Sequence, residues 1–314
     1  REGEILGIVG ESGCGKSVTA QCILKLNPEP PGFFGEHSSI CFRGEELVSK
    51  TEKEMQAVRG AEIGFIFQDP MTSLNPTMKI GRQIEEVLKG RKGYSKKEVR
   101  EKVLKILEMV GISDAKKRYK QYPYELSGGM KQRVMIAIAL VGNPGIVIAD
   151  EPTTSLDVTI EASILDLLKE LQKTFHTAII FITHDLGVIA KLCDRVMVMY
   201  GGKIVERGTV EEIYYDTKHP YTAGLMNSIA RLDLEKSVKL KPIEGTPPDL
   251  FAPPEGCPFA ARCEYAMNIC YRKMPPEFGE KDKHRCMCWL QDEKAPKIRL
   301  KTQLSGKKGG EEHV

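Results

Sequence analysis

A glycine-rich run, GESGCGKS, occupies residues 10–17, directly after the apolar run ILGIV and at the start of a predicted helix over residues 16–26. It fits the pattern G-x-x-x-x-G-K-S/T, whose backbone N–H groups surround phosphates at the start of a helix. Because this loop needs a buried strand before it and a helix after it, it predicts an α/β core. Lys16 is expected to reach the β and γ phosphates of a nucleotide, and Ser17 to bind Mg²⁺. The expected contacts to nucleotide and Mg²⁺ in this loop are Gly10, Ser12, Gly13, Cys14, Gly15, Lys16, Ser17 and Val18.

Three further apolar runs, at residues 63–67, 145–150 and 177–183, predict strands buried on both faces of a parallel sheet. Between the last two, residues 160–173 carry isoleucine and leucine at helical spacing. This alternation of strand and helix supports the α/β core. Residues 79–142 differ, because their many charges and few strand signals predict nearly continuous helix, which would form a subdomain inserted between two strands.

Polar residues follow the predicted strands at their carboxyl ends, where ligands of α/β folds gather. Asp150 suits Mg²⁺, directly or through water, and Glu151 is expected to act as the general base on a water that attacks the γ-phosphate. Gln68 is expected to reach Mg²⁺ and the same water. His184 is expected to bind the γ-phosphate and to hold Glu151 in place.

A second glycine pair lies in LSGGMKQR, at residues 126–133, where another helix is predicted to begin. A helix start of this kind is a second surface suited to phosphate. One nucleotide cannot easily use two such surfaces of the same fold. We therefore expect this chain to complete its active site with another chain.

These motifs together resemble the ATP-binding subunit of ABC transporters, over residues 1 to about 215; the carriers of the resemblance are GESGCGKS, Gln68, LSGGMKQR, IVIADEPTTSLD and THD. The resemblance implies a head-to-tail dimer with two ATP at its interface. Ser127, Gly128 and Gly129 would then bind the γ-phosphate held by the opposite subunit, and Asp157 would lie in the loop for crosstalk between sites. The family also places an adenine-stacking aromatic residue upstream of the phosphate loop. Because the sequence opens at Arg1 directly before a strand, we expect that residue to lie in an upstream segment.

Composition limits the other functions. A net charge of +3 is too weak to argue for nucleic acid binding. No apolar run approaches the roughly 18–20 residues that span a bilayer, so other chains would have to carry this protein to a membrane. A non-transport ABC ATPase acting on nucleic acid would predict coiled-coil or zinc insertions or tandem cassettes, and the 314 residues contain neither pattern.

Five of the nine cysteines fall between residues 257 and 288. Their spacing lacks the C-x2–4-C pairs usual for zinc and the C-x2-C runs usual for iron–sulfur clusters. Disulfides are not expected without secretion. The spacing by itself leaves two readings open, a metal of some kind or free thiols.

The C-terminal part resembles that of the dipeptide, oligopeptide and nickel importer branch, through KHPYTAGLMNSI, the proline-rich residues 242–258 and GCPFAARC. QDPMTSLNP and LSGGMKQRVMIA resemble its D-type ATPase subunit. The resemblance implies a 4Fe–4S cluster; its implied ligands are Cys257, Cys263, Cys270 and Cys288, with Cys286 as the alternative fourth.

The same resemblance implies import of di- or oligopeptides driven by ATP hydrolysis, or of nickel or another small solute as the alternative. The implied partners are a sister F-type ATPase subunit or a second copy, two transmembrane permease subunits and an external peptide-binding protein, with no nucleic acid. Residues 71–78 would help to form the groove for the membrane subunit. The protein would act at the cytoplasmic face of the membrane.

The expected domains follow these changes of pattern: an ATP-binding core at 1–78 and 143–231, a helical subdomain at 79–142, a Pro/Cys-rich extension at 232–300 and a disordered tail at 301–314.

Overall fold

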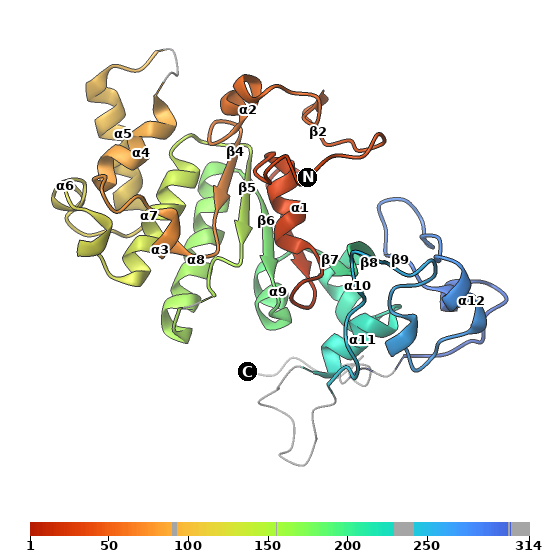
Figure 1. The fold of residues 1–314 in the computed structure, drawn as a ribbon. Coiled ribbons are helices and arrows are strands. Elements are labelled where there is room, and N and C mark those ends of the chain that lie inside the picture. Colours follow the sequence, from red (N-terminus) through yellow and green to blue (C-terminus); the bar gives the residue numbers. More distant parts are fainter. Residues whose placement is uncertain (90–92, 155, 229–241, 301, 303–314) are drawn as a thin grey trace, which may run out of the picture. The chain divides into compact units, whose positions relative to one another are not determined.

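The computed structural model of the protein describes residues 1–89, 93–154, 156–228, 242–300 and 302. It divides into two compact units: Arg1–Ile5 with Ser17–Ile182 form the first, and Leu6–Lys16 with Thr183–Val314 form the second. Both units combine strands with helices, as the α/β prediction requires (Figure 1). The predicted tail, apart from residue 302, and residues 232–241 of the predicted extension lie outside the described residues.

The first unit contains a parallel sheet with the strand order β4, β5, β6. The strands are β4 (Ile63–Ile66), β5 (Ile146–Asp150) and β6 (Ala178–Thr183). Ile148 pairs with Phe65 on one side and with Ile180 on the other, and it is fully buried. Strands covered on both faces need such apolar runs, and the three predicted strands are confirmed with one residue trimmed from each.

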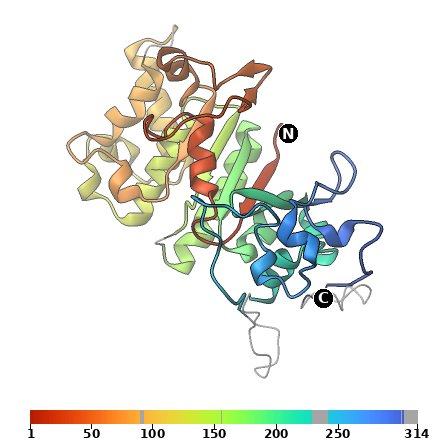
Figure 2. The same cartoon turned by 45° about the vertical axis from the view of Figure 1, so that its right-hand side comes forward.

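The helices of the first unit include the predicted helical segment. They are α1 (Lys16–Ile23), α2 (Glu52–Val58), α3 (Pro70–Ser73), α4 (Ile80–Leu88), α5 (Lys96–Met109), α6 (Ala115–Arg118), α7 (Gly128–Leu140) and α8 (Val158–Phe175), with a small ribbon of β2 (Cys41–Phe42) and β3 (Glu45–Glu46) before α2. Helices α4, α5 and α7 pack against one another (Figure 2). Residues 79–142 are largely helical, but the prediction of a nearly continuous helix is wrong, because the described residues among them form four separate α-helices. The chain turns at Gly111, which has a φ of 75°, and again at Pro123, which begins a 3₁₀ turn.

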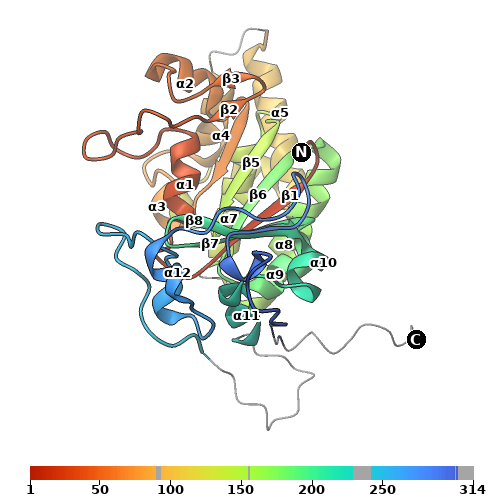
Figure 3. The same ribbon diagram turned by 90° about the vertical axis from the view of Figure 1, so that its right-hand side faces the viewer.

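The second unit contains a mixed sheet with the strand order β1, β7, β8, β9. Figure 3 labels the first three of these strands. Its elements are β1 (Ile5–Val9), α9 (Leu186–Leu192), β7 (Arg195–Tyr200), β8 (Lys203–Thr209), α10 (Val210–Tyr215), α11 (Pro220–Asn227), α12 (Asn268–Arg272) and β9 (Arg285–Cys286). Strand β1 is parallel to β7, whereas β7 with β8 and β8 with β9 are antiparallel. Gly201 and Gly202, with φ of 55° and 74°, form the tight turn between β7 and β8. The sequence patterns did not predict this hairpin.

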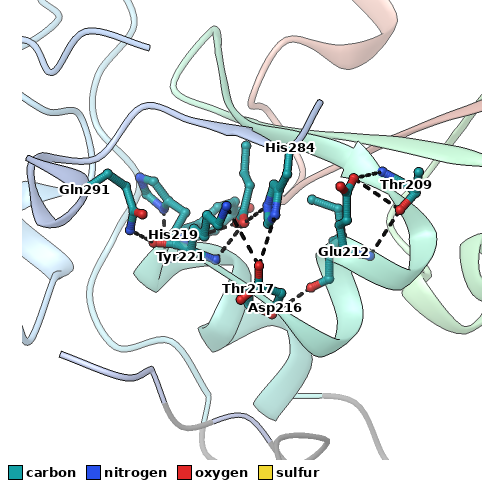
Figure 4. Close-up of polar contacts among 11 residues, drawn as sticks. Thr209, Glu212, Asp216, Thr217, His219, Tyr221, His284 and Gln291 are labelled. Carbon is teal, nitrogen blue, oxygen red and sulfur yellow. Dashed lines mark hydrogen bonds and ion pairs between the residues drawn. The ribbon is translucent and has the colours of Figure 1, made fainter. Parts of the chain in front are cut away.

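Buried polar contacts attach the C-terminal region, defined as residues 242–300, to β8. Glu206 is 1% exposed, and its carboxylate accepts hydrogen bonds from the backbone N–H groups of Lys218 at 2.7 Å and His219 at 3.1 Å. The same carboxylate lies 2.7 Å from Nε2 of His284 in the C-terminal region. Figure 4 shows His284 facing Asp216 as well, with 3.8 Å between Nδ1 and the carboxylate. A buried carboxylate requires such partners, so these contacts fix where the C-terminal region joins the sheet.

Replacing His219 by Asn is expected to remove one source of acid sensitivity. Burial lowers the pKa of His219 to about 4, against the opposing effect of Glu206. The unfolded chain has an ordinary imidazole pKa near 6.5, so between about pH 6.5 and about pH 4 only the unfolded state takes up this proton. The free energy of unfolding of the wild type should therefore fall there by roughly 1 kcal/mol per pH unit more than that of the variant. Urea titrations across this range check the difference; equal slopes would contradict it. Asn keeps an acceptor for the N–H of Tyr221, which His219 Nδ1 accepts at 3.0 Å.

Replacing Gly64 by Ala is expected to push α7 away from β4. A Cβ at position 64 would lie 2.3 Å from the carbonyl oxygen of Ala139, which belongs to the helix backbone and cannot move aside. The expected loss is about 1–3 kcal/mol in the free energy of unfolding, measured by chemical denaturation. The control is Gly35→Ala, where the nearest atom would be 3.8 Å away. Equal stability of the two variants would argue against the close approach of helix and strand.

Candidate functional site

The phosphate loop closes around the ammonium group of Lys16. This side chain is buried, and its Nζ donates hydrogen bonds to the carbonyl oxygens of Gly10 at 2.9 Å and Glu11 at 3.0 Å. Position 10 requires glycine, because a Cβ there would lie 2.2 Å from the carbonyl oxygen of Met199 at the end of β7. Two interactions therefore restrict the loop: its carbonyl groups bind Lys16, and its backbone packs closely against the end of β7.

The other loop residues differ in exposure. Cys14 is buried, and its carbonyl accepts a hydrogen bond from the N–H of Gly202 at 3.0 Å. Burial raises the pKa of the Cys14 thiol, although the charge of Lys16 lowers it. Gly15 has a φ of 103°, a conformation that favours glycine. The exposed positions are Ser12, Gly13 and Val18. Ser12 and Gly13, which are predicted to contact phosphate, are thus accessible in this loop.

In the first unit, the two predicted Mg²⁺ ligands lie together. Asp150 ends β5 and is 3% exposed, and its Oδ1 accepts a hydrogen bond from Oγ of Ser17 at 2.9 Å. Ser17 is in the first turn of α1. A carboxylate and a hydroxyl at this separation supply two oxygen ligands of the kind that Mg²⁺ takes.

Glu151 lies just beyond β5, in contact with Gln68. Its Oε2 accepts hydrogen bonds from Nε2 of Gln68 at 3.0 Å and from Oγ1 of Thr154 at 2.9 Å. Its backbone has a φ of 43°, a left-handed conformation that costs a non-glycine residue about 1–2 kcal/mol. The strained turn at Glu151 was not foreseen, because the sequence places it as a continuation of the strand. Local strain of this sort clusters at functional sites.

His184 follows β6 and is exposed. It belongs to the second unit, whereas Glu151 belongs to the first. The predicted contact between them therefore stays a prediction. The next residue, Asp185, caps α9 by accepting the N–H of Gly187 at 2.6 Å.

The second glycine pair opens α7, as predicted. Ser127 is the N-cap residue, and its Oγ accepts the N–H of Met130 at 3.4 Å. Ser127 and Gly128 are exposed, which leaves the start of a 13-residue helix open to an anion. Gly129 is buried, and a Cβ there would lie 3.2 Å from Ile160 in α8. Asp157 caps α8, accepting the N–H groups of Thr159 and Ile160.

Three residues that contact the phosphate loop, or belong to it, had no predicted role. The side chain of Glu11 pairs with Arg262, and its backbone N–H donates to the hydroxyl oxygen of Tyr221 at 2.8 Å. Arg262 lies 251 residues away along the chain. No spacing rule links residues so distant, so the sequence holds no signal for this pair.

The five clustered cysteines all lie in the second unit, and all but Cys263 are buried. Burial is the main cause that raises the pKa of Cys257 to about 11 and that of Cys263 to about 12, and the charges of Cys270 and Cys288 contribute to both increases. Burial also raises the pKa of Cys286, while a hydrogen bond from Cys286 lowers the pKa of Cys288. Cys257, Cys263, Cys270 and Cys288 are thus electrostatic neighbours.

These thiols do not form a ready metal site. Over the part of the chain that the structure describes, no three or more His, Cys, Asp or Glu side chains are arranged to hold a metal ion. The backbone does bring two of the thiol-bearing segments together, since the N–H of Cys257 donates to the carbonyl of Cys270 at 2.7 Å.

Proteins of known family share sequence with this chain over most of its length. Residues 1–154 match the family described as ABC transporter, and residues 205–270 match the family described as oligopeptide/dipeptide transporter, C-terminal region. The chain is 57% identical to the oligopeptide transport ATP-binding protein OppD of Bacillus subtilis, over 95% of this chain and 83% of that protein. This chain belongs to the ABC transporter ATP-binding family. It is also 53% identical to the dipeptide transport ATP-binding protein DppD of Bacillus subtilis, over 94% of this chain and 87% of that protein.

Solved structures of the family have the same fold. The dimeric ATP-binding cassette MJ0796, in a post-hydrolysis state bound to ADP and Pi, matches with a TM-score of 0.58 and 29% identity, over 67% of this chain and 87% of that chain. The predicted P-loop ABC ATPase fold and the family resemblance are therefore confirmed, and with them ATP hydrolysis coupled to transport. No helix in the described ranges combines the length and the apolar character needed to cross a membrane.

Proposed function

We propose that this protein is the ATP-hydrolysing subunit that energises the import of di- or oligopeptides. The observation that carries the proposal is the contact of Glu151 with Gln68 directly beyond β5, next to the paired Ser17 and Asp150. The match of residues 205–270 to the oligopeptide/dipeptide transporter C-terminal region supports peptides as the cargo. We also propose the domains predicted from the sequence: an ATP-binding core at 1–78 and 143–231, a helical subdomain at 79–142 and a C-terminal extension from residue 232.

Each residue has a chemical role in hydrolysis. The backbone of the phosphate loop and Lys16 would hold the β and γ phosphates, and Ser17 with Asp150 would hold Mg²⁺, whose charge offsets that of the phosphates. Glu151 would accept a proton from a water molecule. The oxygen of that water forms a bond to the γ-phosphorus, while the bond between the γ-phosphorus and the β-phosphate oxygen of the leaving ADP breaks. Gln68 would orient that water through its contact with Glu151. His184 would hydrogen-bond the γ-phosphate.

A second ATP-binding subunit would complete the site. Ser127, Gly128 and Gly129 would bind the γ-phosphate held by that subunit, and Asp157 would lie at the contact between the two sites. The exposed start of α7 supports this, because the positive end of the helix dipole attracts anions. The related cassette MJ0796 was solved as a dimer. We propose a sister F-type subunit as the partner, with a second copy of this chain as the alternative.

Two transmembrane permease subunits and an external peptide-binding protein would form the rest of the transporter, and this chain would then act at the cytoplasmic face of the membrane. The segment at residues 71–78 would contact a permease. Met71 supports this role, because its side chain is 63% exposed while Lys131 of α7 approaches its sulfur at 3.0 Å. That contact joins the segment after Gln68 to the helix that begins at Ser127.

We also propose that the C-terminal region holds a 4Fe–4S cluster. The ligands would be Cys257, Cys263, Cys270 and Cys288, because Cys270 and Cys288 lie close enough to both Cys257 and Cys263 for their charges to raise the pKa of these two thiols. Cys286 instead hydrogen-bonds Cys288 and lies near Glu206. Bound iron would ionise the thiols and cross-link three segments of the C-terminal region.

Replacing Glu151 by Gln is expected to lower ATP turnover by at least about 100-fold, because the amide cannot accept the proton of the attacking water. ATP binding should persist, so ATP-bound dimers should accumulate. Phosphate release and size-exclusion chromatography with the partner subunit measure both effects. Glu170→Gln, an exposed position on α8, serves as the control. Turnover that survives in the Glu151 variant would refute the assignment of the base.

The transport role has its own test. The ATPase rate should rise when the permease subunits and a peptide-loaded binding protein are added in a lipid bilayer. Stimulation by nucleic acid, without stimulation by these partners, would contradict the import proposal.

Replacing Cys257, Cys263 or Cys270 by Ser is expected to abolish the visible absorption and bound iron of protein purified without oxygen. Cys41→Ser, at an exposed cysteine outside the cluster, should leave both unchanged. Cys288→Ser should lose the absorption, whereas Cys286→Ser should keep it. A colourless wild type without iron would refute the cluster, and the reverse result for the last two variants would make Cys286 the fourth ligand.

A further inference from the structure

Arg262 in the C-terminal region makes a partly buried ion pair with Glu11 in the phosphate loop. The Arg262 side chain is only 4% exposed. Its Nη1 donates to one carboxylate oxygen of Glu11 at 2.6 Å, and its Nη2 donates to the other at 3.0 Å. This two-bond arrangement fixes the direction of the carboxylate as well as its distance.

The same guanidinium is held from the other sides. Nη1 also donates to the hydroxyl of Tyr200 at 3.1 Å, Nη2 to the carbonyl of Ile243 at 3.1 Å, and Nε to the carbonyl of Glu244 at 2.9 Å. These contacts engage all five N–H donors of the side chain. The bond to Glu11 is the main cause that raises the pKa of Arg262 above its ordinary value. Arg262 is therefore a rigid, permanently charged group, and its position is set by the C-terminal region.

Glu11 transmits this position to the phosphate loop. Its side chain is fixed by Arg262, and its N–H donates to the hydroxyl oxygen of Tyr221 at 2.8 Å. Its carbonyl oxygen accepts a hydrogen bond from Nζ of Lys16 at 3.0 Å. The side chain, the N–H and the carbonyl of Glu11 therefore all have partners. The carbonyl holds Lys16, the residue expected to bind the phosphates.

An aromatic cluster supports the contact. The rings of Tyr200 and Tyr221 lie 4.5 Å apart, and Phe259 lies 5.2 Å and 5.4 Å from them. The guanidinium of Arg262 lies over the rings of Tyr200 and Phe259, at 5.7 Å and 6.0 Å from their centroids. Such rings pack with little freedom to rearrange, so movement of Arg262 would be resisted.

Arg262 lies in a short turn between two cysteines. It is the last residue of a 3₁₀ turn, Ala260–Arg262, between Cys257 and Cys263. The N–H of Arg262 donates to the carbonyl of Phe259 at 3.0 Å, which closes this turn, and the N–H of Ala260 donates to the carbonyl of Cys257 at 3.0 Å, which links the turn to the first cysteine. The conformation of the cysteine-bearing turn therefore sets where the guanidinium lies.

We propose that Arg262 is a positioning residue for ATP binding: it fixes Glu11, and through Glu11 it holds the phosphate loop in its closed shape around Lys16. A buried ion pair by itself is weak support for stability, because the desolvation of both charges offsets their attraction. Its effect here is on conformation, since it restricts a loop whose backbone must meet the phosphates. The inference rests on the proposed function, in which this loop binds ATP.

The test compares Arg262→Met with Arg207→Met in the full-length protein. Arg207 on β8 makes a similar two-bond pair with Glu277 of the C-terminal region, at 2.7 Å and 2.8 Å, and this pair involves no residue of the phosphate loop. The dissociation constant for MgATP, measured by calorimetry, should rise about tenfold or more in Arg262→Met, which corresponds to about 1.4 kcal/mol. It should stay within about twofold of wild type in Arg207→Met. In turnover with the partner subunit, KM should rise while kcat at saturating ATP changes by less than about threefold.

Two further variants keep the inference testable if Arg262→Met fails to fold. Glu11→Gln leaves the C-terminal region unchanged and should weaken MgATP binding, and Arg262→Lys, which keeps the charge but not the two-bond geometry, should rescue part of the affinity. The loss in the double variant Glu11→Gln/Arg262→Met should be smaller than the sum of the single losses. Wild-type affinity in Arg262→Met or in Glu11→Gln would overturn the inference. Equal weakening by Arg207→Met would also overturn it, because general loosening would then explain the effect. A wild type that fails to bind MgATP would instead refute the proposed function.

Discussion

Parallel pairing of strands buried on both faces is the constraint on which the candidate site depends. In such a sheet the carboxyl ends of neighbouring strands meet at one edge, and residues that follow those ends come together. The pairing of β4 with β5 thus brings Gln68, from one strand end, to Glu151, from the next. The two residues are 83 positions apart in sequence, yet the register of the sheet leaves 3.0 Å between their polar atoms.

Helix starts provide the other recurring element of the site. Ser127 and Asp157 each cap a helix, and each was predicted to act at a dimer contact. The two roles are compatible, because a cap satisfies only one or two of the free N–H groups at a helix start. Ser127 and Gly128 are exposed, so a ligand can reach the start of α7. Local capping therefore builds the surface that is proposed to bind a partner's phosphate.

The C-terminal region depends on buried polar contacts more than on regular structure. Its described part contains one five-residue α-helix, α12, two three-residue 3₁₀ turns at Ala260–Arg262 and Trp289–Gln291, and one two-residue strand, β9. Glu206 and Arg262 attach it instead, one to β8 and the other to the phosphate loop. Because a buried charge without its partner is costly, these contacts hold the region in one position. This is the physical basis on which an extension far along the chain would influence nucleotide binding.

The amino-acid sequence by itself determined the strands of the parallel sheet, the phosphate loop and the second glycine pair, because each is written in a short local pattern. It also indicated the protein family, because the residue types in the family's motifs are those that bind phosphate and Mg²⁺. Tertiary structure alone decided the breaks in the segment after residue 79, the β7–β8 hairpin, the left-handed turn at Glu151 and the pairing of Arg262 with Glu11. The reason is that an ion pair or a strained turn depends on which distant segments meet, and spacing along the chain does not record that.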